Sequence, residues 1–242
     1  AEMNNIEQIS QERLVLLNNK THVYLIKLDL FDSKECIKYL SDDELIRAEN
    51  FKIVEKKDQF IITRSILRIL LSIAMSKSYE KINIFHEENG KPSIKELLNG
   101  KPIGFNVSHS GNYALIAVSL NNKVGVDIEL MDLHVDYKKL SKRFFSEQEY
   151  DELQKFHYDN QRDIFYRIWA RKESFVKATG HGIKFGLKNF SIILDSDCEV
   201  GVKVVTSVPL KDSWFTYNIF ELDSYKTALT ISTEDSDIIL HQ

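Results

Sequence analysis

Cysteine, proline and glycine are scarce in this chain, which has two, three and nine of them among its 242 residues. Cys36 and Cys198 belong to no CxxC pair and no Cys/His cluster. A zinc site is therefore not expected, and both are predicted to be reduced structural thiols, which fits the cytosol. No proline- or serine-rich linker and no low-complexity segment divides the chain, so its parts are predicted to pack tightly together.

Long hydrophobic runs are absent as well. No apolar stretch approaches the roughly 20 residues that span a bilayer, and the first five residues have neither the basic nor the apolar region of an export signal. A cytoplasmic protein without a membrane anchor is predicted. The 32 basic and 36 acidic residues give a net charge of −4, which argues against a surface that coats nucleic acid or membranes.

The composition that remains is typical of a globular protein. Hydrophobic residues make up 43% of the chain and charged residues 28%, with a mean hydropathy of −0.27, so a sizeable core can form. The length suits either one compact unit or two packed halves of about 120 residues each.

The most informative stretch is VGVDIEL at residues 124–130. Valine and isoleucine at alternate positions predict an extended strand, in which Asp127 and Glu129 point the same way about 7 Å apart. Two carboxylates on one face of a mostly buried strand need a cation. A lysine, an arginine or a metal ion would each serve.

Similar elements are predicted in the same order in both parts of the chain. Each part has a strand, a helix start capped by serine, a long helix and further strands. In the first part these are 23–30, Ser41, 60–75, 82–85, 105–108 and 113–120, and in the second 124–130, Ser146, 162–179, 190–194, 201–206, 214–221 and 226–232. One unit used twice, at an offset of roughly 100 residues, is predicted, with halves at 1–122 and 123–242.

The predicted long helix of the second half places Glu173 and Lys177 four residues apart on one face. If that face meets the strand with Asp127 and Glu129, the three carboxylates suit Mg²⁺, which prefers a few carboxylates together with waters and substrate phosphates. The alternative is a solvated Glu173–Lys177 pair and a capped strand end, because surface ion pairs are common and weak.

Several residues of the first half could hold phosphate. Ser108 and His109 lie in NVSHSG at a turn between strands, where amides and side chains can bind an anion. Further cationic candidates are Arg47, Arg64, Arg68 and Lys91. Each has an ordinary alternative, since turn histidines are often merely exposed and helix arginines usually lie at the solvent edge. No acid has the spacing that a serine-hydrolase elbow requires.

Together these residues resemble a known family. GVDIE at 125–129, FSxxE at 145–149 and WxxKESFxK at 169–177 closely resemble, in order and spacing, the signature motifs of the Sfp-type 4′-phosphopantetheinyl transferases. The segments GKP at 90–92, FNVSHSG at 105–111 and GxGI at 180–183 also match.

The resemblance implies an α+β fold, a pseudo-dimer of two similar halves in which each half is a small antiparallel sheet packed with helices. It implies coenzyme A and Mg²⁺, for which Mn²⁺ could substitute, in the cleft between the halves of a monomer. The implied activity is that of a holo-[acyl-carrier-protein] synthase (EC 2.7.8.7). A serine hydroxyl of an apo acyl or peptidyl carrier protein attacks the β-phosphate of coenzyme A, giving the modified carrier and 3′,5′-ADP. Such a transfer depends on positioning and charge neutralisation, which a metal, a lysine and a base can supply.

By position in the motifs, Asp127, Glu129 and Glu173 would bind Mg²⁺. The catalytic set would be Asp127, Glu173 and Lys177, with Glu173 as general base and Lys177 in contact with phosphate. Lys172 belongs to the same motif and is included among the expected coenzyme A contacts.

The other coenzyme A contacts are expected from the first half. Ser108 and His109 would hold phosphate groups, His109 the 3′-phosphate, and Lys91 would lie by the adenine. Arg47 stands where the family often has a basic residue. Glu44 departs from the family at a position where some members have lysine, and Arg64 is expected to compensate.

The carrier protein is expected to dock near the same cleft. Carrier domains of this type are usually acidic, so a local basic or apolar patch has to attract them to a chain of net charge −4. The candidates are Phe144, Phe145, Tyr150 and Leu153, although such residues more often belong to a core. Two other functions stay open, a Mg²⁺-dependent nuclease, against which the lack of a basic stripe counts, and a non-catalytic module that binds coenzyme A or a carrier.

Overall fold

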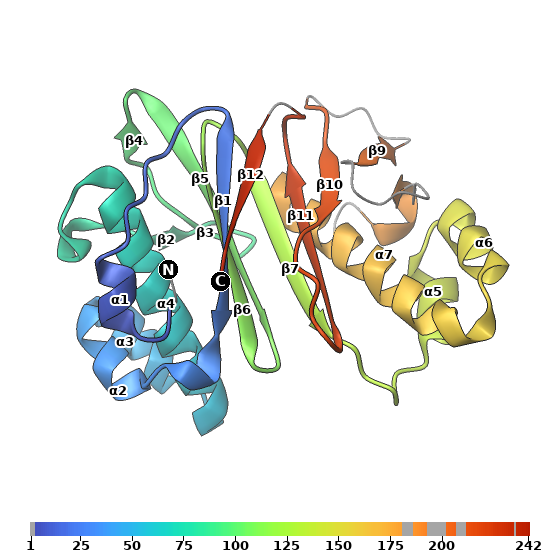
Figure 1. Cartoon of the computed structure of the whole chain (residues 1–242), viewed down its shortest axis with the longest axis horizontal. Coiled ribbons are helices and arrows are strands. Elements are labelled where there is room, and N and C mark those ends of the chain that lie inside the picture. The colour runs from blue at the N-terminus through green and yellow to red at the C-terminus, as the bar shows by residue number, and fades with distance from the viewer. Residues whose placement is uncertain (1–2, 181–185, 193–201, 207–211, 235) are drawn as a thin grey trace.

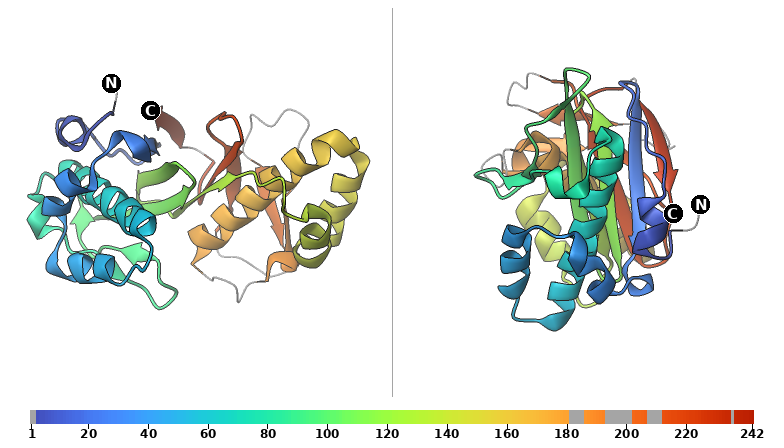
Figure 2. Two further views of the ribbon diagram at one scale, coloured as in Figure 1. Left: turned by 90° about the horizontal axis from the view of Figure 1, so that it is seen from below. Right: turned by 90° about the vertical axis from the view of Figure 1, so that its left-hand side faces the viewer.

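The computed structural model describes residues 3–180, 186–192, 202–206, 212–234 and 236–242. Within these residues the chain forms helices and two five-stranded sheets, with a short two-stranded ribbon beside them (Figure 1). The helices α1 to α4 lie at one end of the molecule and α5 and α6 at the other, with the strands between (Figure 2). The α+β class predicted from the sequence is confirmed.

The first sheet has the strand order β12-β1-β6-β5-β4. Its strands are β1 (Lys20–Lys27), β4 (Leu97–Leu98), β5 (Lys101–Ser110), β6 (Tyr113–Leu120) and β12 (Asp237–His241). The helices beside it are α1 (Ile6–Ser10), α2 (Ser33–Cys36), α3 (Asp42–Glu49) and α4 (Val54–Met75), and the ribbon is β2 (Phe85–His86) with β3 (Pro92–Ser93). The core of this half forms where α4 packs on the sheet, and it contains Tyr24, Ile69 and the thiol of Cys36. Burial raises the pKa of that thiol to about 11.

The second sheet has the strand order β7-β11-β10-β9-β8. Its strands are β7 (Val124–Leu130), β8 (Phe190–Ile192), β9 (Val202–Thr206), β10 (Phe215–Asn218) and β11 (Tyr225–Ile231). Its helices are α5 (Tyr137–Phe144), α6 (Glu147–Lys155) and α7 (Tyr158–Thr179).

The two halves repeat one topology. In each, the first strand pairs antiparallel with the last strand of the unit, β1 with β6 and β7 with β11. The long helices α4 and α7 both have 22 residues and both end at a left-handed residue, Ser76 and Gly180. A complete capping box opens α3 at Ser41 and Glu44 and opens α6 at Ser146 and Glu149, as serine three residues before glutamate favours.

The division predicted between residues 122 and 123 falls in the turn between β6 and β7, but the last strand crosses it. β12 pairs in parallel with β1, so the end of the chain returns to the first sheet. An apolar core also joins the halves. Val23 and Leu115 of the first sheet pack there with Val126, Ile128 and Leu229 of the second. Burying these faces against one another stabilises the two halves as one body.

Some elements differ from the prediction. Residues 82–84 lie outside any strand, and the extended segment begins at Phe85. Both long helices begin earlier than predicted, at Val54 and Tyr158, because polar first turns conceal a helix start from hydrophobic periodicity. Cys198, Leu194, Gly182 and Ile183 lie outside the described residues. Across the part of the chain that is described, no helix has the length and apolar character to cross a membrane.

Candidate active site

Helix α7 packs closely on strand β7 at Gly125. A β-carbon at this position would lie 2.1 Å from the carbonyl oxygen of Ser174 and 2.9 Å from the β-carbon of Ala178. Only glycine permits this approach of helix to strand. The close contact brings Glu173 and Lys177 of α7 beside Asp127.

The three acids predicted from the sequence influence one another electrostatically. Asp127 is only 4% exposed, and its Oδ2 atom has no hydrogen-bond partner. Burial raises the pKa of Asp127 well above its usual range, and Glu129 and Glu173 raise it further against the opposing effect of Lys177. Burial and Glu129 likewise raise the pKa of Glu173, while Lys177 and Lys172 oppose the rise. The nearby lysines do not supply enough positive charge to offset the burial and mutual repulsion of these carboxylates.

The described residues contain no preassembled group of three or more acidic, histidine or cysteine side chains at metal-binding distances. The chemistry of the cluster nevertheless fits Mg²⁺. Its donors are carboxylate oxygens, which that ion prefers, and the unpartnered Oδ2 of buried Asp127 is an acceptor that needs a cation.

Two predicted phosphate-binding lysines lie along β7. The Nζ atom of Lys177 donates to Val126 O at 3.2 Å and lies 3.5 Å from Asp127 Oδ1. The Nζ atom of Lys91 donates to Val124 O at 3.2 Å and to Lys177 O at 3.0 Å. Burial, with Lys123 and Lys177 nearby, lowers the pKa of Lys91 to about 8 although Glu87 opposes this. Both ammonium groups therefore lie at the seam between the halves.

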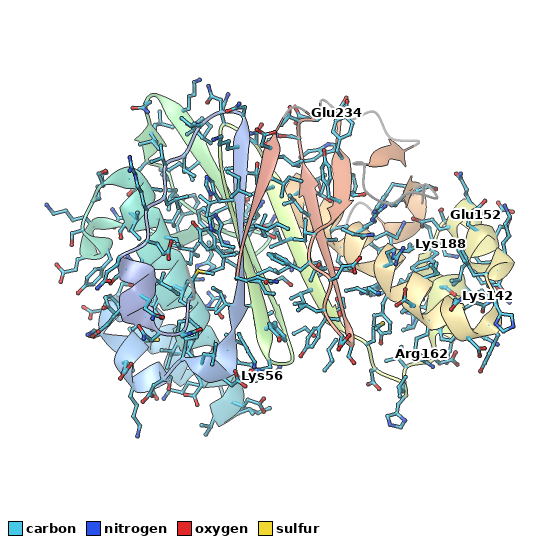
Figure 3. The ribbon with its side chains drawn as sticks, in the orientation of Figure 1. Lys56, Lys142, Glu152, Arg162, Lys188 and Glu234 are labelled. Atoms are coloured by element: carbon cyan, nitrogen blue, oxygen red, sulfur yellow. The ribbon has the colours of Figure 1, made fainter. Side chains whose placement is uncertain are left out.

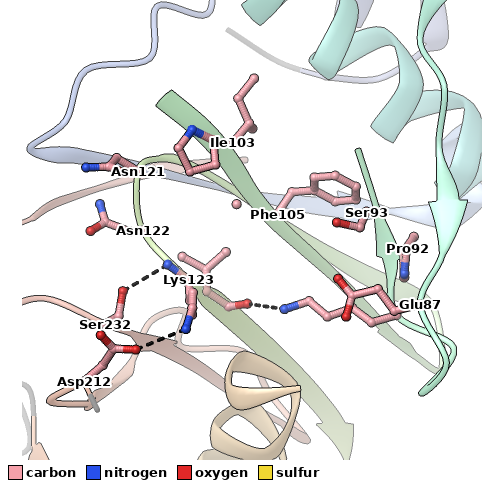
Figure 4. A pocket seen from close by; sticks show the side chains of 14 residues that line it. Glu87, Pro92, Ser93, Ile103, Phe105, Asn121, Asn122, Lys123, Asp212 and Ser232 are labelled. Carbon is pink, nitrogen blue, oxygen red and sulfur yellow. Dashed lines mark hydrogen bonds and ion pairs between the residues drawn. The ribbon is translucent and has the colours of Figure 1, made fainter. Parts of the chain in front are cut away.

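Cavities flank Lys91 on the seam. One, of about 270 Å³, is lined by Asn89, Gly90, Lys91, Pro92, Asn106, Val107, Val176 and Lys177. Another, of about 360 Å³, has Glu87, Phe105, Lys123 and Asp212 among its lining residues (Figure 4). Lys91 extends from the loop between β2 and β3 of the first half to β7 and α7 of the second.

Ser108 and His109 point in different directions from β5. Ser108 is 6% exposed, and its hydroxyl donates to Asp127 Oδ1 at 3.3 Å. His109 is more exposed. Partial burial of its ring, with Lys56 and Lys177 nearby, lowers the pKa of His109. His109 thus lies within electrostatic reach of two lysines, and Ser108 contacts an acid.

Glu44, which departs from the expected family pattern, lies in a buried ion-pair network. Its carboxylate pairs with Arg64 at 3.0 Å and with Arg68 at 2.6 Å, and all three side chains are buried. Although burial alone would raise it, bonding to Ser41 and the two arginines holds the pKa of Glu44 below its usual value. Arg64 also bonds His86 Nε2 at 3.1 Å. Arg64 is thus held within a buried ion-pair network, its compensating role stays a prediction, and the exposed Arg47 is the less constrained cation.

Lys172 lies in an equivalent ion pair in the second half. Its Nζ atom is 2.6 Å from Glu149 Oε1 and 2.7 Å from Phe190 O, and the residue is 1% exposed. Burial lowers the pKa of Lys172 while Glu149 opposes this. A buried pair of this kind leaves Lys172 without exposed surface for a ligand, although it belongs to the motif.

The hydrophobic docking candidates are mostly core. Phe145 and Leu153 are 2% and 0% exposed, and Tyr150 packs against the same cluster. The sequence analysis did not single out Lys56 or Asn106 for a role, and Arg68, which it offered as a phosphate-binding cation, is held in the ion pair with Glu44. Asn106 stands two positions before Ser108 in a strand, so the period of two was the signal that could have placed both on one face.

The chain resembles known proteins over most of its length. A family described as 4′-phosphopantetheinyl transferase superfamily matches residues 123–230, and one described as 4′-phosphopantetheinyl transferase, N-terminal, matches residues 32–121. The 4′-phosphopantetheinyl transferase HetI of Nostoc sp. is 36% identical over 172 residues, which are 70% of this chain and 73% of that protein.

Two further proteins match over shorter stretches. A putative 4′-phosphopantetheinyl transferase of Synechocystis sp. is 38% identical over 148 residues, so the match spans 61% of this chain and 60% of that protein. The crystal structure of Thermotoga maritima holo-[acyl-carrier-protein] synthase aligns with a TM-score of 0.35 and 19% identity, covering 45% of this chain and 61% of that one.

Proposed function

This chain belongs to the 4′-phosphopantetheinyl transferase superfamily, and from that premise we propose that it transfers 4′-phosphopantetheine from coenzyme A to a serine hydroxyl of an apo carrier protein. The observation that supports this most directly is the buried Asp127 carboxylate, which lies with Glu129 and Glu173 beside Lys177 at the seam between the halves. Family membership gives no support to the nuclease alternative.

Coenzyme A would lie along the seam. The cavity of about 270 Å³ beside Lys91 suits a planar base, and Lys91 and Lys177 could each direct a remaining donor to phosphate. His109, with Lys56 close to it, would meet the 3′-phosphate. Arg47 is exposed and lies near His86, where it could add a further positive charge.

Asp127, Glu129 and Glu173 would hold Mg²⁺. When bound, this ion would neutralise the pyrophosphate and stabilise the charge that develops during transfer. Lys177 would hold a phosphate oxygen beside these acids. In the reaction the bond from the carrier serine Oγ to the β-phosphorus forms as the bond from that phosphorus to the bridging oxygen breaks, and 3′,5′-ADP leaves.

Glu173 would accept the proton of the serine hydroxyl. A general base works best when its pKa approaches the working pH, and burial with Glu129 nearby shifts the pKa of Glu173 in that direction. Its place on α7, one helical turn before Lys177, would put the base and the phosphate contact on the same helix face.

The test is intact mass spectrometry of an apo carrier protein incubated with the chain, coenzyme A and Mg²⁺. A mass gain of one phosphopantetheine is expected across at least one of a panel of fatty-acid, polyketide and peptide carriers. No gain with any carrier would refute the transferase function and favour a non-catalytic binding module.

Replacing Glu173 tests the role of the base. Glu173→Gln should lower the transfer rate at least about 100-fold, while coenzyme A affinity without metal changes by no more than about threefold, because the amide cannot accept the proton. Glu147→Gln, at an exposed acid on α6, is the matched control and should transfer normally. An active Glu173→Gln protein would reject this assignment.

A further inference from the structure

One edge of strand β7 pairs with β11, and the other edge faces β5 of the first half. On that second edge the backbone of β7 bonds to side chains of β5 and not to its backbone. The β7 backbone N–H groups at Val126, Ile128 and Leu130 donate to Asn106 Oδ1 at 2.9 Å, Ser108 Oγ at 3.2 Å and Ser110 Oγ at 3.0 Å. Alternate residues of β5 therefore occupy alternate positions along β7. This ladder of three side-chain bonds fixes the register of β7 against β5. It thereby fixes the position of the acids on β7 relative to the first half.

Ser108 differs from the other two rungs because it also touches a candidate metal ligand. Its hydroxyl accepts from Ile128 N–H and donates its one proton to Asp127 Oδ1 at 3.3 Å. A serine hydroxyl has a single donor, and a phosphate oxygen at neutral pH is an acceptor. Ser108 can therefore bind phosphate only by releasing Asp127, and at 6% exposure it has little surface to offer a ligand.

We infer that Ser108 is a positioning residue for Asp127, holding that carboxylate through its Oδ1 atom while Oδ2 has no hydrogen-bond partner, and not a ligand for coenzyme A phosphate. The inference rests on the proposed function, in which Asp127 binds the metal. Groups that orient a ligand to a metal usually change its affinity about 10- to 100-fold when removed.

Two binding measurements separate this role from phosphate binding. The first is Mn²⁺ affinity, followed by electron paramagnetic resonance with saturating coenzyme A and no carrier protein. The second is calorimetric binding of coenzyme A and of 3′-dephospho-coenzyme A without metal. Ser108→Ala should weaken Mn²⁺ binding by about tenfold and leave the ratio of the two coenzyme affinities within about twofold of wild type.

Ser110→Ala is the matched control, since it removes a neighbouring rung of the ladder without touching an acid. Its Mn²⁺ affinity should stay within about twofold of wild type. Because Ser108→Ala leaves the Ile128 N–H unpaired, it is expected to cost about 1–3 kcal/mol of stability. Ser108→Cys fills the same space with a weaker donor, so it provides the same comparison if the alanine variant does not fold.

The inference is overturned if Mn²⁺ affinity is unchanged in both Ser108 variants, if the wild-type protein binds no Mn²⁺, or if only coenzyme A and not its dephospho form loses about tenfold in affinity. None of these measurements requires transfer. If Mn²⁺ binding depended on Ser108 but no carrier were modified, the proposed function would be refuted and the inference on Ser108 would stand.

Discussion

In the proposed site, Lys91 would serve the ligand with the same ammonium group that links the two halves. Two of its three donors hold carbonyls of β7 and α7, and one remains for an anion. The family resemblance implied that Lys91 lies near the adenine. Its role as a link between the halves could not be read from the sequence, because that role depends on which carbonyls lie opposite.

The lowered pKa of Lys91 predicts a pH-dependent affinity for anions. With a pKa of about 8, the ammonium is charged at pH 7 and mostly neutral at pH 9. The affinity for 3′,5′-ADP, measured by calorimetry without metal, should therefore fall by up to about tenfold over this range. Lys91→Arg keeps its charge and should show a much flatter profile. Equal pH dependence in both proteins would show that Lys91 does not contact the nucleotide.

Helix α5 is a strongly basic surface element of the second half. Its sequence YKKLSKRF contains four basic residues and no acid, and Lys138, Lys139, Lys142 and Arg143 are all exposed. Lys142 lies at the end of the molecule occupied by α5 and α6 (Figure 3). Leu133, which is 77% exposed, lies just before the helix. The patch expected for an acidic carrier thus has a candidate in these cations and not in the buried aromatic residues.

Reversing charge on α5 should weaken carrier recognition selectively. The double variant Lys139→Glu with Lys142→Glu should raise the KM for an acidic carrier by about tenfold at low salt and leave the KM for coenzyme A within about twofold. Lys34→Glu with Lys77→Glu, at exposed lysines of the first half, is the matched control. If both double variants behaved alike, α5 would have no special part in docking.

The sequence predicted the positions of helices and strands better than it predicted which side chains pair with one another. Alternating β-branched residues correctly predicted β7, and serine followed by glutamate located the starts of α3 and α6. The strand β12 was not predicted, because its pairing with β1 joins the two ends of the chain. Lys172 and Arg64 were expected to contact the ligand, and periodicity gave no sign that Glu149 and Glu44 lie opposite them in the interior.

The whole molecule is held together by contacts that cross the midpoint of the chain. One is the core between the two sheets, and another is β12, where His241 stacks on Tyr24 with ring centroids 4.2 Å apart and bonds His22 at 3.0 Å. His22 is 7% exposed. Burial, with His241 and Lys20 nearby, lowers the pKa of His22 to about 4 although a bond to Val15 opposes this.

Global stability should therefore fall on mild acidification. The unfolded chain protonates His22 near pH 6.5, whereas the folded chain does so only near pH 4, so the free energy of unfolding decreases as pH falls between these values. The contribution of His22 is at most about 3 kcal/mol. Urea unfolding at pH 7.5 and 5 should show a smaller decrease in His22→Gln than in wild type. His134→Gln, at an exposed histidine, should lose as much stability as wild type. If His22→Gln also lost as much as wild type, His22 would not be the source of the pH dependence.

The equal lengths of α4 and α7 bear on how many coenzyme sites one chain contains. When the two helices are aligned end to end, Ile69 and Ile73 occupy the places of Glu173 and Lys177, and both pack into the core of the first half. An ancestral gene duplication would account for this correspondence, with acids kept in one copy and aliphatic side chains in the other. The binding stoichiometry should then be one coenzyme per polypeptide, with the first half contributing ligand contacts and the second the acidic cluster.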